Sequence, residues 1–75
     1  MAKEITHEEE MTYRKVLAER IAQNALARAE SIGKKISESE AARIGEWWAN
    51  EETYDCDLTY WENIDNLIER VVEQR

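Results

Sequence analysis

The chain has 75 residues, of which 43% are hydrophobic and 36% are charged, and its formal net charge is −7 at pH 7. This length allows a single domain with a small core and leaves little material for a walled substrate cavity, so an enzyme is not expected. The excess of acidic residues also disfavours direct binding to nucleic acid or to anionic lipid, because both ligands require cationic side chains.

The first predicted helix spans residues 7–32 and follows a tail at residues 1–5 that we expect to be disordered. Thr6 and Glu9 have the spacing of a capping box, in which two side chains satisfy free amide donors at a helix start. Gly33 is expected to end the helix. Helical spacing gives this helix one face of small and apolar residues, which should pack against the rest of the protein: Met11, Ala18, Ile21, Ala22, Ala25, Ala29 and Ile32.

The second predicted helix spans residues 38–50. Ser37 and Glu40 repeat the capping-box spacing at its start. Positions three and four residues apart share one side of a helix, so the inward face is expected to be Ala41, Ile44 and Trp48.

The third predicted helix spans residues 60–74, with Thr59 and Glu62 as its capping box. Its apolar positions recur at three- and four-residue steps, which is the strongest periodic pattern in the chain. These positions are Trp61, Ile64, Leu67, Ile68, Val71 and Val72. The sequence therefore predicts an all-α fold, a three-helix bundle with a long first helix, in one domain covering residues 1–75.

No complete catalytic or metal-binding motif is present. His7 opens a sequence like the zinc-protease helix motif, but a methionine stands where the second histidine is required. Asp55 and Asp57 alternate like calcium ligands, but Tyr60 occupies the glycine position of a calcium loop. Cys56 lies between the two aspartates, whose charges disfavour the thiolate that a nucleophile needs, and we expect it to be half-buried and unreactive. We therefore predict no catalytic residue, no metal and no cofactor.

The single cysteine cannot form an internal disulfide, and no apolar run reaches the length of a signal peptide or of a membrane span. A soluble, cytoplasmic protein is expected. The initial methionine favours a complete small reading frame.

The charge is distributed unevenly along the chain. Residues 44–69 contain eight acidic residues, no lysine or arginine, and five of the six aromatic residues. On the third helix Glu62, Asp65 and Glu69 form one stripe, which we expect to lack compensating cations. Such a surface either only improves solubility or binds a basic partner, and both interpretations remain open.

The two adjacent tryptophans should have different roles. Neighbouring helical residues point about 100° apart, so both cannot lie at the centre of one small core. The spacing groups Trp48 with the buried face and leaves Trp47 at the rim, where it would either anchor a partner or cover the end of the bundle.

Our leading hypothesis is a non-enzymatic binding protein, an inhibitor or regulator that docks on the basic surface of a nucleic-acid-binding protein. Its carboxylates would stand in for phosphates, as in acidic proteins that viruses and mobile elements direct against host defence. The predicted contact residues lie within the segment 46–69 and are Trp47, Glu51, Glu52, Tyr54, Asp55, Asp57, Glu62, Asp65 and Glu69.

The alternative hypothesis is a structural or regulatory subunit that forms a homodimer, or joins a larger assembly, through its first helix. The side of this helix opposite the alanine face is less polar than a solvated face usually is, and it carries Tyr13, Val16, Arg20 and Ala27. A third possibility, a DNA-reading helix-turn-helix built from residues 37–69, has the right shape, but its recognition helix would bring carboxylates toward phosphates.

Overall fold

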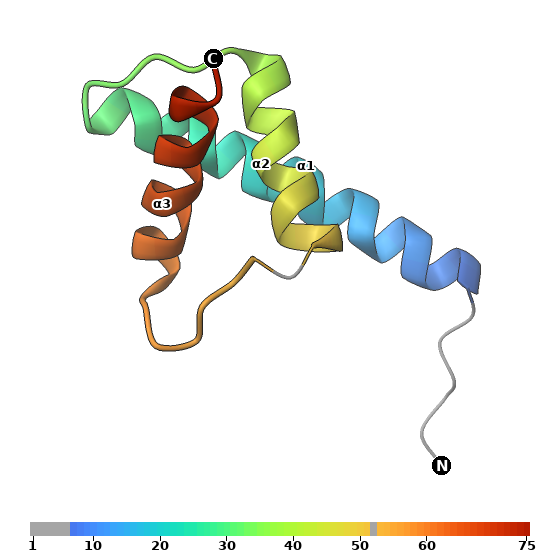
Figure 1. Ribbon diagram of the computed structural model, residues 1–75. Coiled ribbons are helices and arrows are strands. Elements are labelled where there is room, and N and C mark those ends of the chain that lie inside the picture. The colour runs from blue at the N-terminus through green and yellow to red at the C-terminus, as the bar shows by residue number, and fades with distance from the viewer. Residues whose placement is uncertain (1–6, 52) are drawn as a thin grey trace.

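The computed structural model describes residues 7–51 and 53–75, which form three α-helices (Figure 1): α1 (His7–Ser31), α2 (Glu38–Asn50) and α3 (Tyr60–Glu73). The predicted all-α fold with a long first helix is confirmed, and each helix end lies within one residue of its predicted position. The predicted tail at residues 1–5 and the capping role of Thr6 lie outside the described residues. None of the described helices is long and apolar enough to cross a membrane.

Local hydrogen bonds explain the helix ends. At the start of α2 the Ser37 hydroxyl accepts a hydrogen bond from the Glu40 amide, and the Glu40 carboxylate accepts one from the Ser37 amide. Thr59 and Glu62 make the same reciprocal pair at the start of α3. Gly33 follows α1 with a φ of 75°, a left-handed conformation that glycine adopts without strain. Both predicted capping boxes outside the undescribed segment, and the predicted stop, are therefore confirmed.

The helices are not arranged as three parallel rods. In Figure 1, α2 and α3 lie beside each other, run in opposite directions and cross α1, while the N-terminal half of α1 extends beyond them. The molecule measures 47 × 27 × 20 Å as a result. α2 lies directly against the backbone of α1 at Gly45, where a side-chain carbon would collide with the carbonyl oxygen of Ala18. Gly45 thus allows the two backbones to touch where α2 crosses the long helix.

The core lies under this crossing and takes residues from all three helices: Ile21, Ala25, Ala29, Ala41, Ile44, Trp47, Ile64, Leu67, Ile68 and Val71. Three residues predicted to be buried are instead exposed, namely Met11, Ile32 and Trp61. Met11 is 57% exposed and lines an open groove between α1 and α2 instead of entering the core.

The predicted roles of the two adjacent tryptophans are wrong. Trp47 is only 7% exposed and belongs to the core, whereas Trp48 is half-buried. The guanidinium carbon of Arg70, from α3, lies 4.2 Å from the centre of a Trp47 ring and covers it. Trp48 instead contacts Tyr54 and Tyr60, with ring centres 5.1 and 5.3 Å away. The position of α3 decides which indole is covered.

Candidate interaction surfaces

Two of the three carboxylates in the acidic stripe of α3 are paired with cations, one from α1 and one from the segment that follows it. Arg28 donates two hydrogen bonds to the carboxylate of Asp65, at 2.8 and 2.9 Å, and Lys34 lies 3.7 Å from a carboxylate oxygen of Glu69. The expectation that this stripe lacks compensating cations is therefore wrong. The hydrogen bonds from Arg28 hold the pKa of Asp65 below its ordinary value, because they favour the charged carboxylate. Asp65 and Glu69 join α3 to the end of α1.

The remaining acidic and aromatic groups gather where α2 ends and α3 begins. Glu51, Asp55, Asp57 and Glu62 are exposed there. Tyr54 and Trp61 are 48% and 46% exposed beside them. We call these six residues the acidic end. Of the other predicted contact residues, Trp47 is buried, Asp65 and Glu69 are ion-paired, and Glu52 lies outside the described residues.

One buried side chain orders the connection before α3. The amide oxygen of Asn63 accepts a hydrogen bond from the backbone N–H of Asp55 at 2.7 Å. Its amide nitrogen donates to the carbonyl oxygens of Asp55 and Thr59, both at 2.9 Å. Asn63 therefore bonds the loop to the first turn of α3 and fixes where the acidic end is presented. The sequence pattern did not reveal this role.

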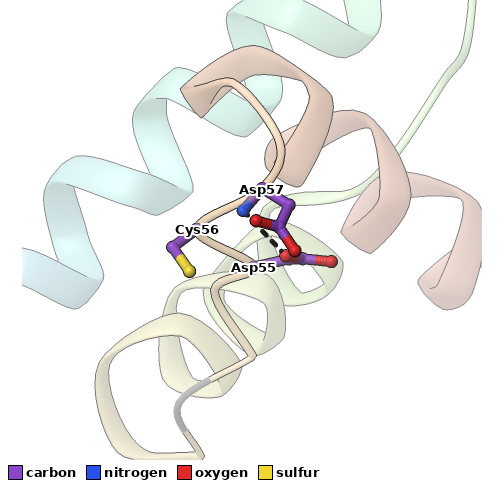
Figure 2. Close-up of side chains that lie close together, drawn as sticks. All are labelled: Asp55, Cys56 and Asp57. Carbon is purple, nitrogen blue, oxygen red and sulfur yellow. Dashed lines mark hydrogen bonds between the residues drawn. The ribbon is translucent and has the colours of Figure 1, made fainter.

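Asp55, Cys56 and Asp57 bring three potential metal-ligand atoms within 4.8 Å of one another (Figure 2). All three residues are exposed, including Cys56, which was predicted to be half-buried. The Asp55 carboxylate already accepts a hydrogen bond from the backbone N–H of Asp57 at 2.9 Å. Calcium needs about six to eight oxygen ligands and structural zinc about four ligands, so three neighbouring loop residues form an incomplete set for either ion.

The side of α1 opposite the core is less acidic than the acidic end and exposes apolar side chains. Tyr13 is 67% exposed and Val16 is 56% exposed, and Arg20 and Ala27 are exposed along the same side. All four predicted self-association residues thus lie at the surface. We call residues 7–16 of α1 the projecting half. Of the six large hydrophobic side chains exposed in the described part of the chain, three belong to it, namely Met11, Tyr13 and Val16.

A groove of about 560 Å³ runs along the other flank of the projecting half, between α1 and α2. Small residues lie in it, including Ala18 and Ala22 of α1 and Ala42 of α2. Met11 and Lys15 line its α1 side, and Glu46 and Asn50 line its α2 side. The projecting half of α1 is therefore accessible on both flanks.

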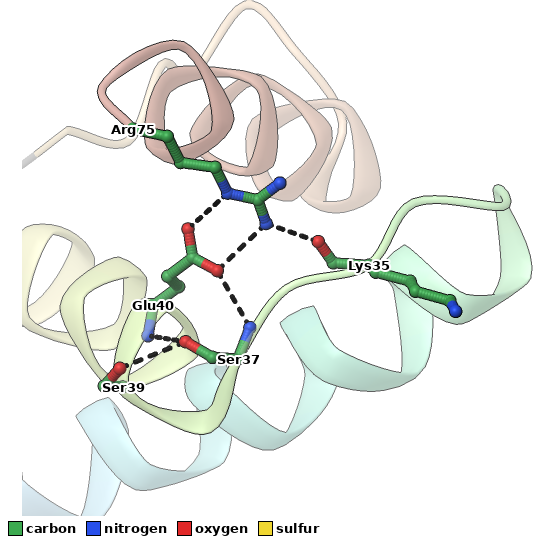
Figure 3. A network of polar contacts seen from close by, with 5 residues as sticks. All are labelled: Lys35, Ser37, Ser39, Glu40 and Arg75. Carbon is green, nitrogen blue, oxygen red and sulfur yellow. Dashed lines mark hydrogen bonds and ion pairs between the residues drawn. The ribbon is translucent and has the colours of Figure 1, made fainter.

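Arg75, which follows α3, is bonded to the start of α2 and to the segment before it (Figure 3). Arg75 donates hydrogen bonds to both carboxylate oxygens of Glu40, at 2.8 and 2.9 Å, and a third to the backbone carbonyl of Lys35. The bonds from Arg75 and from the Ser37 amide lower the pKa of Glu40 to about 2. One carboxylate thus caps α2 and also holds the residue that follows α3.

A comparison of the sequence with family models finds no match, and comparisons with curated proteins and with solved structures find none either. The candidate surfaces are therefore judged on their own geometry and chemistry.

Proposed function

We propose that this protein is a non-enzymatic interaction module, a structural or regulatory subunit that assembles with another protein chain through the N-terminal half of α1. The observation that carries the proposal is the projection of this half beyond the bundle with Met11, Tyr13 and Val16 exposed. A 75-residue chain has only a small core, and three large apolar side chains that remain outside it contribute little burial energy until a partner covers them.

The shape of this half supports the same proposal. It extends beyond the bundle, so a partner can contact both the side that carries the groove and the side that carries Tyr13 and Val16. Contacts there leave the core residues undisturbed, because the core lies farther along α1, at Ile21, Ala25 and Ala29. Exposed tyrosine and methionine are typical of interface centres.

A second candidate function uses the acidic end as an inhibitor's docking face for a basic, nucleic-acid-binding protein surface. Two exposed aromatic rings, Tyr54 and Trp61, stand among carboxylates there. Carboxylates would guide the approach of a basic partner, and the rings would give contact area once docked. In this candidate Trp61 takes the anchoring role that we predicted for Trp47 from the sequence.

One capture experiment separates the two functions. The parent protein and two variants serve as baits for proteins of the cells that produce the chain, at low and at high salt. Val16→Glu places a charge on the projecting half, and the triple variant Glu51→Lys, Asp55→Lys, Asp57→Lys reverses the acidic end. We expect Val16→Glu to lose the parent's specific partner and the triple variant to keep it.

The reverse outcome, a partner lost by the triple variant and by high salt but kept by Val16→Glu, would favour the inhibitor function. Circular dichroism of each variant checks that the helices remain. A partner retained by both variants would place the contact on another surface and contradict both functions.

A further inference from the structure

We infer that the projecting half of α1 pairs with the same segment of a second copy of this chain, in an antiparallel arrangement with a defined register. The inference rests on the proposed function in that both use the exposed N-terminal half of α1. It goes further by naming the partner, a second copy of the chain, and the residues in contact. The residues that carry it are Glu9, Tyr13, Val16 and Arg20, which we call the outer stripe.

The outer stripe is continuous along one side of the helix. Steps of four, three and four residues separate its members, so their side chains follow one another along the surface opposite the core. All four residues are exposed. Two apolar side chains, Tyr13 and Val16, stand at the centre, with an acidic residue at one end and a basic residue at the other. In the described part of the chain, Arg20 has no ion pair, whereas Glu9 already has an interaction within its own chain. An ionised carboxylate offers about four acceptor sites, so Glu9 can accept a second partner as well.

This order of side chains is complementary to itself when reversed. A two-fold axis between Arg14 and Lys15 places Tyr13 of one copy against the second copy's Val16. The same axis places Glu9 against the second copy's Arg20. The two-fold symmetry doubles each contact, giving two tyrosine–valine contacts flanked by two ion pairs of opposite charge.

Charge also selects this arrangement over its alternative. In a parallel pair in register, Glu9 would face Glu9 and Arg20 would face Arg20, which places like charges together at both ends. The antiparallel pair brings opposite charges together and also aligns the two helix dipoles favourably. The groove between α1 and α2 plays no part in this contact, because the outer stripe faces away from α2.

The contact is short, so the dimer should be weak. Eleven residues separate Glu9 from Arg20, a helix length of about 16 Å. One side of a helix over this length offers much less surface than the about 800 Å² that each partner buries in a standard stable interface. We therefore expect a dissociation constant of about 10–1000 µM.

Sedimentation equilibrium of the full chain from about 10 µM to about 1 mM provides the first test, over the range in which such a dimer forms. We expect reversible dimerisation. Arg20→Glu alone should weaken it by about tenfold or more, because like charges then face each other at both ends. The double variant Glu9→Arg, Arg20→Glu should restore it to within about threefold, because each ion pair re-forms with its charges exchanged.

This rescue is specific to the dimer, since Glu9 and Arg20 are too far apart on one helix to form a pair within the same chain. Ala42→Glu, an exposed change in the groove on the other flank, is the matched control and should leave dimerisation unchanged. A parent protein that stays monomeric at 1 mM, or a double variant that fails to recover, would overturn the inference.

Disulfide trapping tests the register directly, in a Cys56→Ser background. Chains carrying Tyr13→Cys are mixed with an equal amount of chains carrying Val16→Cys and oxidised. The mixed disulfide should exceed the half of all dimers that random pairing gives, because residues 13 and 16 face each other across the axis. A random distribution would contradict the register. A monomeric protein that still loses its captured partner with Val16→Glu would leave the proposed function standing without this inference.

Discussion

The two halves of α1 belong to one uninterrupted helix, and yet their surroundings differ completely. The C-terminal half contributes Ile21, Ala25 and Ala29 to the core and is joined to α3 by Arg28. The N-terminal half has no fully buried residue among those described; only Leu17, at its inner end, packs against the core, and Met11, Tyr13 and Val16 are exposed. Backbone hydrogen bonding is the same in both halves, so the comparison separates helix formation, which is local, from burial, which depends on the other helices.

The largest expected effect is a difference in stability between core and projecting positions. Ile21→Ala should lower the free energy of unfolding by about 2–5 kcal/mol, because it leaves a cavity under α2 and α3. Val16→Ala should change it by less than about 0.5 kcal/mol. Urea denaturation at low protein concentration measures both. Ile21→Val, expected to cost about 0.5–1.5 kcal/mol, serves if the alanine variant does not fold. Equal losses at positions 16 and 21 would mean that the projecting half is also packed.

Hydrogen exchange should reveal the same boundary without any mutation. Amides of residues 11–16 should exchange about 100-fold faster than those of residues 25–29, because the projecting half can open without disturbing the core. Exchange followed by NMR measures each amide separately. The difference in exchange rate between the two segments should be largest at protein concentrations too low for dimerisation, because the dimer would protect residues 11–16. Uniform protection along α1 would contradict the separation of the helix into two halves.

A substitution at Gly45 tests the crossing of α2 over α1, which lies near the boundary between the two halves of α1. Alanine normally stabilises a helix interior relative to glycine by about 1 kcal/mol. At Gly45 the added methyl group would collide with the Ala18 carbonyl and push α2 away from α1. Gly45→Ala should therefore destabilise the protein by about 1–3 kcal/mol. Ala42→Gly, at an exposed position of the same helix, should lose only the ordinary helix propensity of about 1 kcal/mol. A stabilised Gly45→Ala variant would show that the backbones do not touch.

The smallest expected effect concerns ion pairs and pH. The folded pKa of Asp65 lies below its ordinary value, so its contribution to stability is complete above the unfolded pKa of about 4 and is lost as the pH falls below it. Glu40 behaves in the same way between its ordinary value of 4.5 and about 2. Asp65→Asn should therefore flatten the loss of stability that begins as the pH falls below about 4.

Glu10→Gln is the matched control, because Glu10 pairs with Arg14 at 2.7 Å within the projecting half, where no other helix is involved. Removal of the Glu10 carboxylate should cost less stability than removal of the Asp65 carboxylate, because an exposed pair within one helix contributes only about 0.2–0.5 kcal/mol. Thermal unfolding at a series of pH values compares the two variants. A flattening by Glu10→Gln as large as that by Asp65→Asn would remove the distinction between the two halves.

Among the candidate surfaces, the exposed positions of α1 were easier to predict than the acidic face. Tyr13, Val16, Arg20 and Ala27 all lie opposite the buried alanines, as helical spacing predicted. The prediction that the acidic stripe lacks cations failed because its two partners, Arg28 in α1 and Lys34 just after it, lie thirty-five or more residues away in the chain. The pairing of Arg28 could not be predicted from the sequence, because it depends on how α3 packs against α1 and not on residues near Arg28 in the chain.

The sequence by itself determined the three helices and their ends. Capping residues act over three positions and Gly33 acts through its own φ angle, so these features depend only on nearby residues. Only the tertiary structure decided that Trp47 rather than Trp48 enters the core and that Met11 and Trp61 stay exposed. It also decided that Arg28 and Lys34 pair with two of the three acidic residues of the α3 stripe. These outcomes depend on where α2 crosses α1 and where α3 lies beside it, and helical periodicity contains no information on either.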